Sequence, residues 1–272
     1  MFDRVEDWSD AYENRAYVPG FERFVARWAE EGERARRDAG AATLDIPYGP
    51  DPRQRFDLFL PGSKPAGLAV FVHGGYWRSF GRESFGHLAA GARAAGYAVA
   101  VPSYRLAPGV GVPEITADVA AAVAAAAAEV TGPLLLAGHS AGGHLACRLA
   151  EAEGPLPEAV AGRIAHLLSI SGLHDLRPLL GTDKNEDLRM DAAVADAESP
   201  ALRAPRAGLR LTTWVGGDER PEFIRQSALI ANIWLGLGAE TRLVVEPGKH
   251  HFDVIEPLED PESPLTRAFL GA

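Results

Sequence analysis

The pattern Gly138-His139-Ser140-Ala141-Gly142 is the clearest chemical signal in the chain. It directly follows the apolar run 134–137 and precedes a stretch rich in helix-forming residues. On a sharp turn from a strand into a helix, a serine hydroxyl projects above the sheet, and small residues two positions away prevent clashes. The helix N-terminus favours negative charge that develops there. A glycine-rich turn with an incidental serine is the alternative, but the flanking strand and helix favour Ser140 as a nucleophile.

A second glycine-containing motif, His73-Gly74-Gly75-Tyr76-Trp77, ends the earlier apolar run 68–72. Hydrolases with a serine turn of this kind place part of their oxyanion hole after such a strand. We therefore predict that the amides of Gly75, Tyr76 and Ala141 bind an oxyanion. A tight turn beneath a buried aromatic pair is the alternative. We expect His73 to brace this loop through hydrogen bonds rather than to take part in the chemistry.

A serine nucleophile of this type needs an acid and a histidine base, which follow the serine in that chain order. Asp218 and Glu219 follow the apolar run 209–215, and His250 and His251 follow the last run, 241–245. A buried carboxylate in that place orients the imidazole and stabilises its charged form. Position alone does not separate the two members of either pair.

Short apolar runs alternate with helical stretches, which predicts an α/β protein with a mostly parallel central sheet flanked by helices. Runs without polar alternation predict strands that are buried on both faces. The predicted strands are 68–72, 97–101, 134–137, 164–170, 209–215 and 241–245, preceded by a hairpin of 43–48 and 55–60. The predicted helices are 21–37, 84–95, 113–130, 141–151 and 221–237.

The length of the chain suits a single domain that spans residues 1–272. Residues 1–40 form a predicted N-terminal helical segment, which we expect outside the sheet or over the site. The segment 173–205 carries mixed charge and is too long for a simple connection. We expect it to be a short lid-like insertion that shapes the pocket.

Composition excludes several classes of partner. The net charge of −10 argues against nucleic acid or an anionic membrane and leaves a small-molecule substrate. Cys147 is the only cysteine, and no histidine–carboxylate group has metal-ligand spacing, so we expect no disulfide, metal or other cofactor. Neither a secretory signal nor a membrane-spanning run is visible, which predicts a cytoplasmic protein. The sequence does not set the oligomeric state and is compatible with a homodimer.

Motifs that extend along almost the whole chain match one family. They are HGGYW at 73–77, GHSAGGHL at 138–145, SGLHDLRP at 171–178, PEFIRQS at 221–227 and HFD at 251–253. The HGG and G-x-S-x-G elements are shared by many esterases, whereas the longer motifs are typical of a smaller group of proteins. In these motifs the chain resembles the kynurenine formamidases (arylformamidases) with the α/β-hydrolase fold, relatives of the hormone-sensitive-lipase-like esterases.

This resemblance implies roles for individual residues. The histidine directly before Phe-Asp is the family's base, which corresponds to His251. The family's acid stands two residues before Pro-Glu-Phe, which corresponds to Glu219. Related members often have aspartate there, so Asp218 stays as a rival acid.

The resemblance also implies a reaction, the hydrolysis of N-formyl-L-kynurenine to L-kynurenine and formate by a Ser-His-acid triad. Tyr76 and Trp77 offer flat surfaces for an aryl ring, although both would equally suit the core. A broad carboxylesterase acting on small acyl or aryl esters is the nearest alternative. A non-catalytic binding protein with the hydrolase fold is a more distant one.

Overall fold

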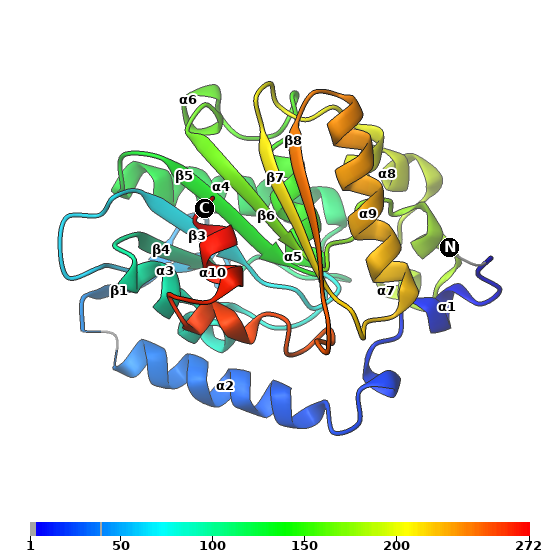
Figure 1. Cartoon of the computed structure of the whole chain (residues 1–272), viewed down its shortest axis with the longest axis horizontal. Coiled ribbons are helices and arrows are strands. Elements are labelled where there is room, and N and C mark those ends of the chain that lie inside the picture. The colour runs from blue at the N-terminus through cyan, green and yellow to red at the C-terminus, as the bar shows by residue number, and fades with distance from the viewer. Residues whose placement is uncertain (1–3, 39) are drawn as a thin grey trace.

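The computed structural model describes residues 4–38 and 40–272, so residues 1–3 and 39 of the predicted N-terminal segment lie outside the described residues. Eight strands form one sheet in the order β1-β2-β4-β3-β5-β6-β7-β8 (Figure 1). The pairs of β2 with β1 and with β4 are antiparallel, and all other pairs are parallel. The strands are β1 (Ala42–Pro47), β2 (Arg55–Phe59), β3 (Leu68–Val72), β4 (Ala98–Pro102), β5 (Leu134–His139), β6 (Ile164–Ile170), β7 (Arg210–Gly216) and β8 (Glu240–Glu246).

Helices cover both faces of the sheet, as predicted for this fold class (Figure 1). One apolar cluster joins the sheet to α4, α5 and α9, and a second joins its other face to α2, α3 and α10. The helices are α1 (Trp8–Ala11), α2 (Glu22–Arg37), α3 (Ala90–Ala94), α4 (Val112–Glu129), α5 (Ala141–Leu149), α6 (Glu158–Ala161), α7 (Asn185–Leu188), α8 (Ala192–Ala197), α9 (Pro221–Gly236) and α10 (Pro264–Phe269).

The central strand β3 shows why the inner strands lack polar positions. Leu68, Val70 and Val72 enter the first apolar cluster, whereas Ala69 and Phe71 enter the second. Successive side chains of a strand point to opposite faces, so a strand covered on both faces must be apolar at every position. The prediction from the apolar runs is confirmed for this strand.

Two predicted features are wrong. The helix expected over 84–95 is broken into 3-10 turns at Arg82–Ser84 and Gly86–Ala89, followed by α3. Glycines lower helix propensity, and the backbone here lies so close to α2 that a Cβ on Gly32 would overlap the carbonyl oxygen of Glu83. The close contact with α2 is therefore accompanied by short 3-10 turns in this segment, where a regular helix was expected.

The last strand differs from the prediction in its burial. β8 lies at the edge of the sheet, and the side chains of Leu243 and Val245 remain 41% and 42% exposed. An apolar run at a sheet edge resembles a central strand in sequence, because only the order of the strands decides which run has neighbours on both sides.

Two segments outside this core border the site described below. The N-terminal helix α2 packs Trp28 against Phe85 and Phe252. The segment 173–205 forms short helical turns, including α7 and α8. Its role as a lid stays a prediction. None of the helices in residues 4–38 and 40–272 is long and apolar enough to cross a membrane.

Candidate active site

Ser140 occupies the sharp turn between β5 and α5. Its backbone has φ 55° and ψ −120°, which an L-residue rarely adopts. Close approaches on both sides require glycine, because a Cβ on Gly138 would overlap the carbonyl oxygen of Gly142, and a Cβ on Gly142 would overlap that of Val72. The strained turn and its small neighbours are those expected of a serine held above a sheet.

The HGG loop lies directly against this turn. A Cβ on Gly74 would lie 2.9 Å from the Cβ of Ser140. Gly75 has φ +110°, and Tyr76 also has a positive φ of 50°. Among the described residues, the amides of Gly75, Tyr76 and Ala141 donate no hydrogen bond to a protein acceptor. Three donors near the Ser140 turn are therefore free to bind an anion.

His251 and Glu219 form a buried pair at the same edge of the sheet. Nδ1 of His251 lies 2.6 Å from Oε2 of Glu219, and the two side chains are 8% and 0% exposed. The other carboxylate oxygen of Glu219 accepts a hydrogen bond from the Gly216 amide at 2.9 Å and another from the Ser171 hydroxyl. These bonds satisfy the buried carboxylate and fix its orientation toward the imidazole.

The structure separates the members of both ambiguous pairs. Asp218 is exposed, and its backbone amide donates to the carbonyl of Lys249 at 2.9 Å. His250 turns to Asp253, whose Oδ1 lies 3.0 Å from its Nδ1. Only Glu219 and His251 of the four meet each other.

Ser140 and His251 line one pocket together with Gly74, Gly75 and His139. In the part of the chain that the structure describes, no hydrogen bond joins the Ser140 hydroxyl to the His251 ring. Hydrogen bonds between catalytic groups often tighten only when substrate is bound. The shared pocket gives both side chains access to the same small molecule.

Two further histidines beside the site stay neutral. Burial lowers the pKa of His73 to about 3; its Nδ1 lies 2.8 Å from the carbonyl oxygen of Gly74, and its ring stacks on Tyr104. Burial and the neighbouring His251 ring lower the pKa of His139 well below its ordinary value. His73 thus lies where a loop brace was expected.

The two aromatic residues expected to contact an aryl ring lie in different places. Tyr76 lines the pocket. Trp77 is fully buried, packs edge-on against His144 in the core and does not line the pocket. The substrate contact expected of Trp77 is therefore wrong, and the core alternative describes this residue.

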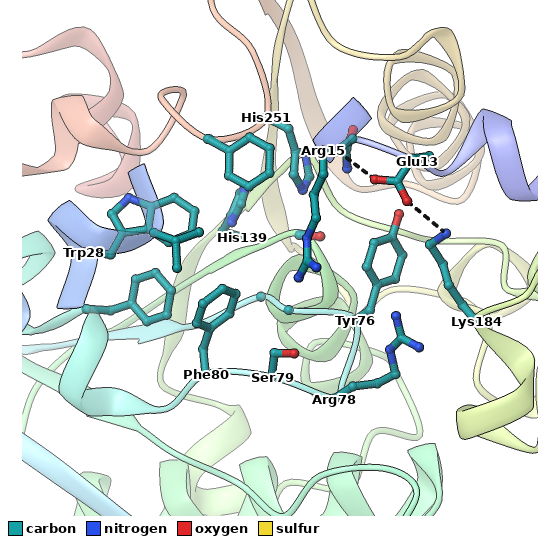
Figure 2. A pocket seen from close by; sticks show the side chains of 17 residues that line it. Glu13, Arg15, Trp28, Tyr76, Arg78, Ser79, Phe80, His139, Lys184 and His251 are labelled. Carbon is teal, nitrogen blue, oxygen red and sulfur yellow. Dashed lines mark hydrogen bonds and ion pairs between the residues drawn. The ribbon is translucent and has the colours of Figure 1, made fainter. Parts of the chain in front are cut away.

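Sequence reasoning missed most of the pocket wall. Figure 2 shows Trp28 and Phe80 at one end of the pocket, Glu13, Arg78 and Lys184 at the other, and His139, His251 and Arg15 between them. These residues come from separate elements and share no motif. Ser171 was also missed as the partner of Glu219, although its place directly after β6 is a signal for the same sheet edge.

Within residues 4–38 and 40–272, no group of three His, Cys, Asp or Glu side chains is arranged to hold a metal ion. The arrangement of Ser140, the free amides and the His251–Glu219 pair has the parts needed for acyl transfer to a serine.

Comparisons with known proteins agree with this fold. The model of the family described as "Alpha/beta hydrolase family" matches residues 69–269. Kynurenine formamidase from Danio rerio is 29% identical over 250 residues, with 89% of this chain and 85% of that protein covered. The enzyme of the same name from Drosophila melanogaster is 26% identical, with 90% and 86% covered. A crystal structure from Silicibacter sp. TM1040, described as a suggested thioesterase, is 48% identical with a TM-score of 0.92, covering 99% of this chain and 100% of that one.

The family match covers most of the chain, and the relatives cover nearly all of it. Their shared chemistry is hydrolysis of an amide or ester bond, and this chain is a hydrolase of that kind. It belongs to the alpha/beta hydrolase family.

Proposed function

We propose that this protein hydrolyses the formamide of N-formyl-L-kynurenine, or a close aryl formamide, through a triad of Ser140, His251 and Glu219. The single observation that supports this most is the buried His251–Glu219 pair facing a pocket that Ser140 also lines. The similarity to kynurenine formamidases over 89% of the chain supports the choice of substrate.

The proposed reaction has two halves. His251 takes the proton of Ser140, whose oxygen attacks the formyl carbon, and the negative charge moves to the carbonyl oxygen. The amides of Gly75, Tyr76 and Ala141 bind that oxyanion; removing one such donor typically slows a serine hydrolase by about 10²–10³-fold. His251 then gives its proton to the aryl amine, which leaves and so produces a formyl ester on Ser140.

Water completes the cycle. His251 takes a proton from the water molecule as its oxygen attacks the formyl ester. The second oxyanion collapses, formate leaves, and the proton returns to Ser140. Glu219 keeps the Nδ1 hydrogen of His251 directed at its own carboxylate, so that Nε2 is free to face Ser140, and it stabilises the imidazolium.

The aromatic end of the pocket fits the aryl group of such a substrate. Trp28, Phe80 and Phe252 line it and lie in ring contact with one another through Trp28. Aromatic rings favour offset or edge-to-face contacts with a further ring. The mechanism uses side chains and backbone amides alone and so needs no cofactor.

A second candidate is hydrolysis of small esters or thioesters by the same machinery. The observation that favours it is the 48% identity to the structure described as a suggested thioesterase. Serine, base and oxyanion donors serve both chemistries, and the walls of the pocket decide between them.

A substrate panel tests the proposal. We expect kcat/KM for N-formyl-L-kynurenine to exceed that for p-nitrophenyl acetate and for phenyl thioacetate. A negligible rate on the formamide with rapid cleavage of the other two would favour the second candidate. Labelling with a fluorophosphonate, lost in Ser140→Ala, excludes a non-catalytic binding protein.

A further inference from the structure

The pocket has two chemically different ends. One is aromatic, formed by Trp28, Phe80, Phe85 and Phe252. The other carries charged side chains, and Figure 2 shows them grouped around Tyr76. They are Glu13, Arg15, Arg78 and Lys184. Three of these side chains are cations and one is a carboxylate, so the charge that this end offers to a ligand depends on which cations have partners within the protein.

Two of these cations already have carboxylate partners. Arg78 Nη1 lies 2.6 Å from Asp187 Oδ2. Lys184 is 4% exposed; its Nζ lies 3.1 Å from Asp183 Oδ1 and 3.9 Å from Glu13 Oε2. These contacts neutralise both charges within the protein.

Arg15 differs from both. Among the described residues no carboxylate lies within ion-pair distance of its guanidinium, and its charged group lies 5.6 Å from the centre of the Phe21 ring. Figure 2 shows its side chain extending into the pocket between His251 and Tyr76. Arginine forms two parallel hydrogen bonds with a carboxylate, so an unpaired guanidinium in a pocket is suited to that group.

The adjacent Asn14 supplies an independent observation. Asn14 is 5% exposed and lines the same pocket, and its Nδ2 has no hydrogen-bond partner among the described residues. Buried amide groups in proteins are almost always hydrogen-bonded, and an unpaired one indicates a missing acceptor. A ligand oxygen in the pocket would satisfy it.

We propose that this end of the pocket binds the α-amino acid group of the substrate. Arg15 and the Asn14 amide donate to its carboxylate, and Glu13 accepts from its ammonium group. Glu13 is held beside Arg15, because its Oε1 accepts the Arg15 amide at 2.7 Å, and its Oε2 lies 3.9 Å from Lys184 Nζ, which is beyond hydrogen-bond distance and leaves this oxygen able to accept. The inference rests on the proposed function and narrows the substrate class to aryl formamides that carry an α-amino acid group.

The position of this subsite is fixed by a buried anchor next to it. The Tyr12 hydroxyl donates to Glu222 Oε1 at 2.8 Å and accepts from Gln226 Nε2 at 2.8 Å, and the Tyr76 hydroxyl donates to the Tyr12 carbonyl. Residues 13–15 are thereby held against α9 and the HGG loop. A preorganised segment loses little entropy when it binds a ligand.

A pair of matched substrates tests the subsite. N-formyl-L-kynurenine carries the amino acid group, whereas 2-formamidoacetophenone has the same aryl formamide without it. In Arg15→Gln we expect the ratio of their kcat/KM values to fall about 10–100-fold, mainly through KM of the first, since a charge-assisted bidentate contact is lost. Arg15→Lys should recover part of the ratio. Arg23→Gln is the matched control, because Arg23 also lies over a phenylalanine ring but not in the pocket.

Product binding provides a readout that does not need formamide turnover. L-kynurenine should inhibit p-nitrophenyl acetate hydrolysis more strongly than 2-aminoacetophenone does, and Arg15→Gln should remove that difference. Equal ratios in wild type and Arg15→Gln would overturn the subsite while leaving the proposed function intact. If neither formamide is hydrolysed and L-kynurenine does not inhibit, both proposals fail.

Discussion

Two regions of the molecule form one pocket by different means. The first, called the hydrolytic edge below, consists of Ser140, His251 and Glu219 at the carboxyl ends of the strands, and the second consists of residues 13–15 in the N-terminal segment. Ser140, His251 and Glu219 follow the carboxyl ends of β5, β8 and β7 and lie within the part matched by the family model. Residues 13–15 precede that part and reach the pocket through a loop anchored by side-chain bonds of Tyr12. The parallel sheet brings strand ends together as a consequence of topology, whereas the loop depends on individual contacts.

This difference separates two properties of the enzyme. In our proposal, Ser140, His251 and Glu219 determine the type of reaction, and residues 13–15 supply contacts that distinguish one substrate from another. Changes at the edge should therefore affect all substrates alike, and changes in the segment should affect them selectively.

The largest effect expected is that of His251→Ala. Loss of the base should lower kcat by about 10⁴-fold or more on N-formyl-L-kynurenine and on p-nitrophenyl acetate, measured by steady-state kinetics. His250→Ala is the adjacent control and should retain most activity, because that ring faces Asp253. A similar loss in both variants would contradict the assignment of the base.

The second largest loss of activity is expected when the acid is replaced. Glu219→Gln should lower kcat by about 10²–10⁴-fold on both substrates, because an amide no longer holds the imidazole in the required tautomer. Asp218→Asn should change kcat less than about twofold, since surface substitutions rarely matter. Equal or reversed losses would contradict the assignment of Glu219 as the acid.

The anchor of the N-terminal segment should affect stability and selectivity together. Tyr12→Phe removes the buried hydroxyl that bonds both Glu222 and Gln226, one of these bonds being to a carboxylate, and should lower the free energy of unfolding by about 1–3 kcal/mol, measured by urea denaturation. It should also raise KM for N-formyl-L-kynurenine more than for p-nitrophenyl acetate. Tyr17→Phe, at a residue 49% exposed, is the control. An equal change in KM for both substrates would contradict the idea that the N-terminal segment affects substrates selectively.

The smallest effect expected concerns pH. Because the pKa of His139 is lowered well below its ordinary value, this residue stays neutral as the pH falls. Acidification should then reduce kcat/KM for p-nitrophenyl acetate without a contribution from His139, so the logarithmic plot should have a slope no steeper than about 1. A slope of about 2 would contradict this, because it would show that His139 also takes up a proton in that pH range.

Sequence predicted the hydrolytic edge far better than the rest of the pocket. The parallel strands 68–72 and 164–170 are confirmed with their bounds, because apolar runs and the glycines around Ser140 are local signals. Position in the chain left His250 and His251, and Asp218 and Glu219, as open pairs, since neighbours in a loop differ only in the direction they face. Only the resemblance in the family motifs favoured His251 and Glu219. Their catalytic roles stay predictions.

No local sequence signal predicts that the N-terminal segment lines the pocket. Asn14 and Arg15 lie in a short polar stretch that resembles any surface loop, and they reach the pocket only because Tyr12 contacts α9 more than 200 residues later in the chain. Lys184 likewise is buried by tertiary packing that no periodicity indicates. Long-range side-chain contacts therefore set the part of the site that the sequence did not reveal.

Formate release from N-formyl-L-kynurenine by the wild-type protein and by Ser140→Ala, with folding checked by circular dichroism, tests the central claim most directly. We predict rapid release by the wild type and a rate at least about 10⁴-fold lower in the folded variant. Release by folded Ser140→Ala within tenfold of the wild type would contradict a serine nucleophile at the β5–α5 turn.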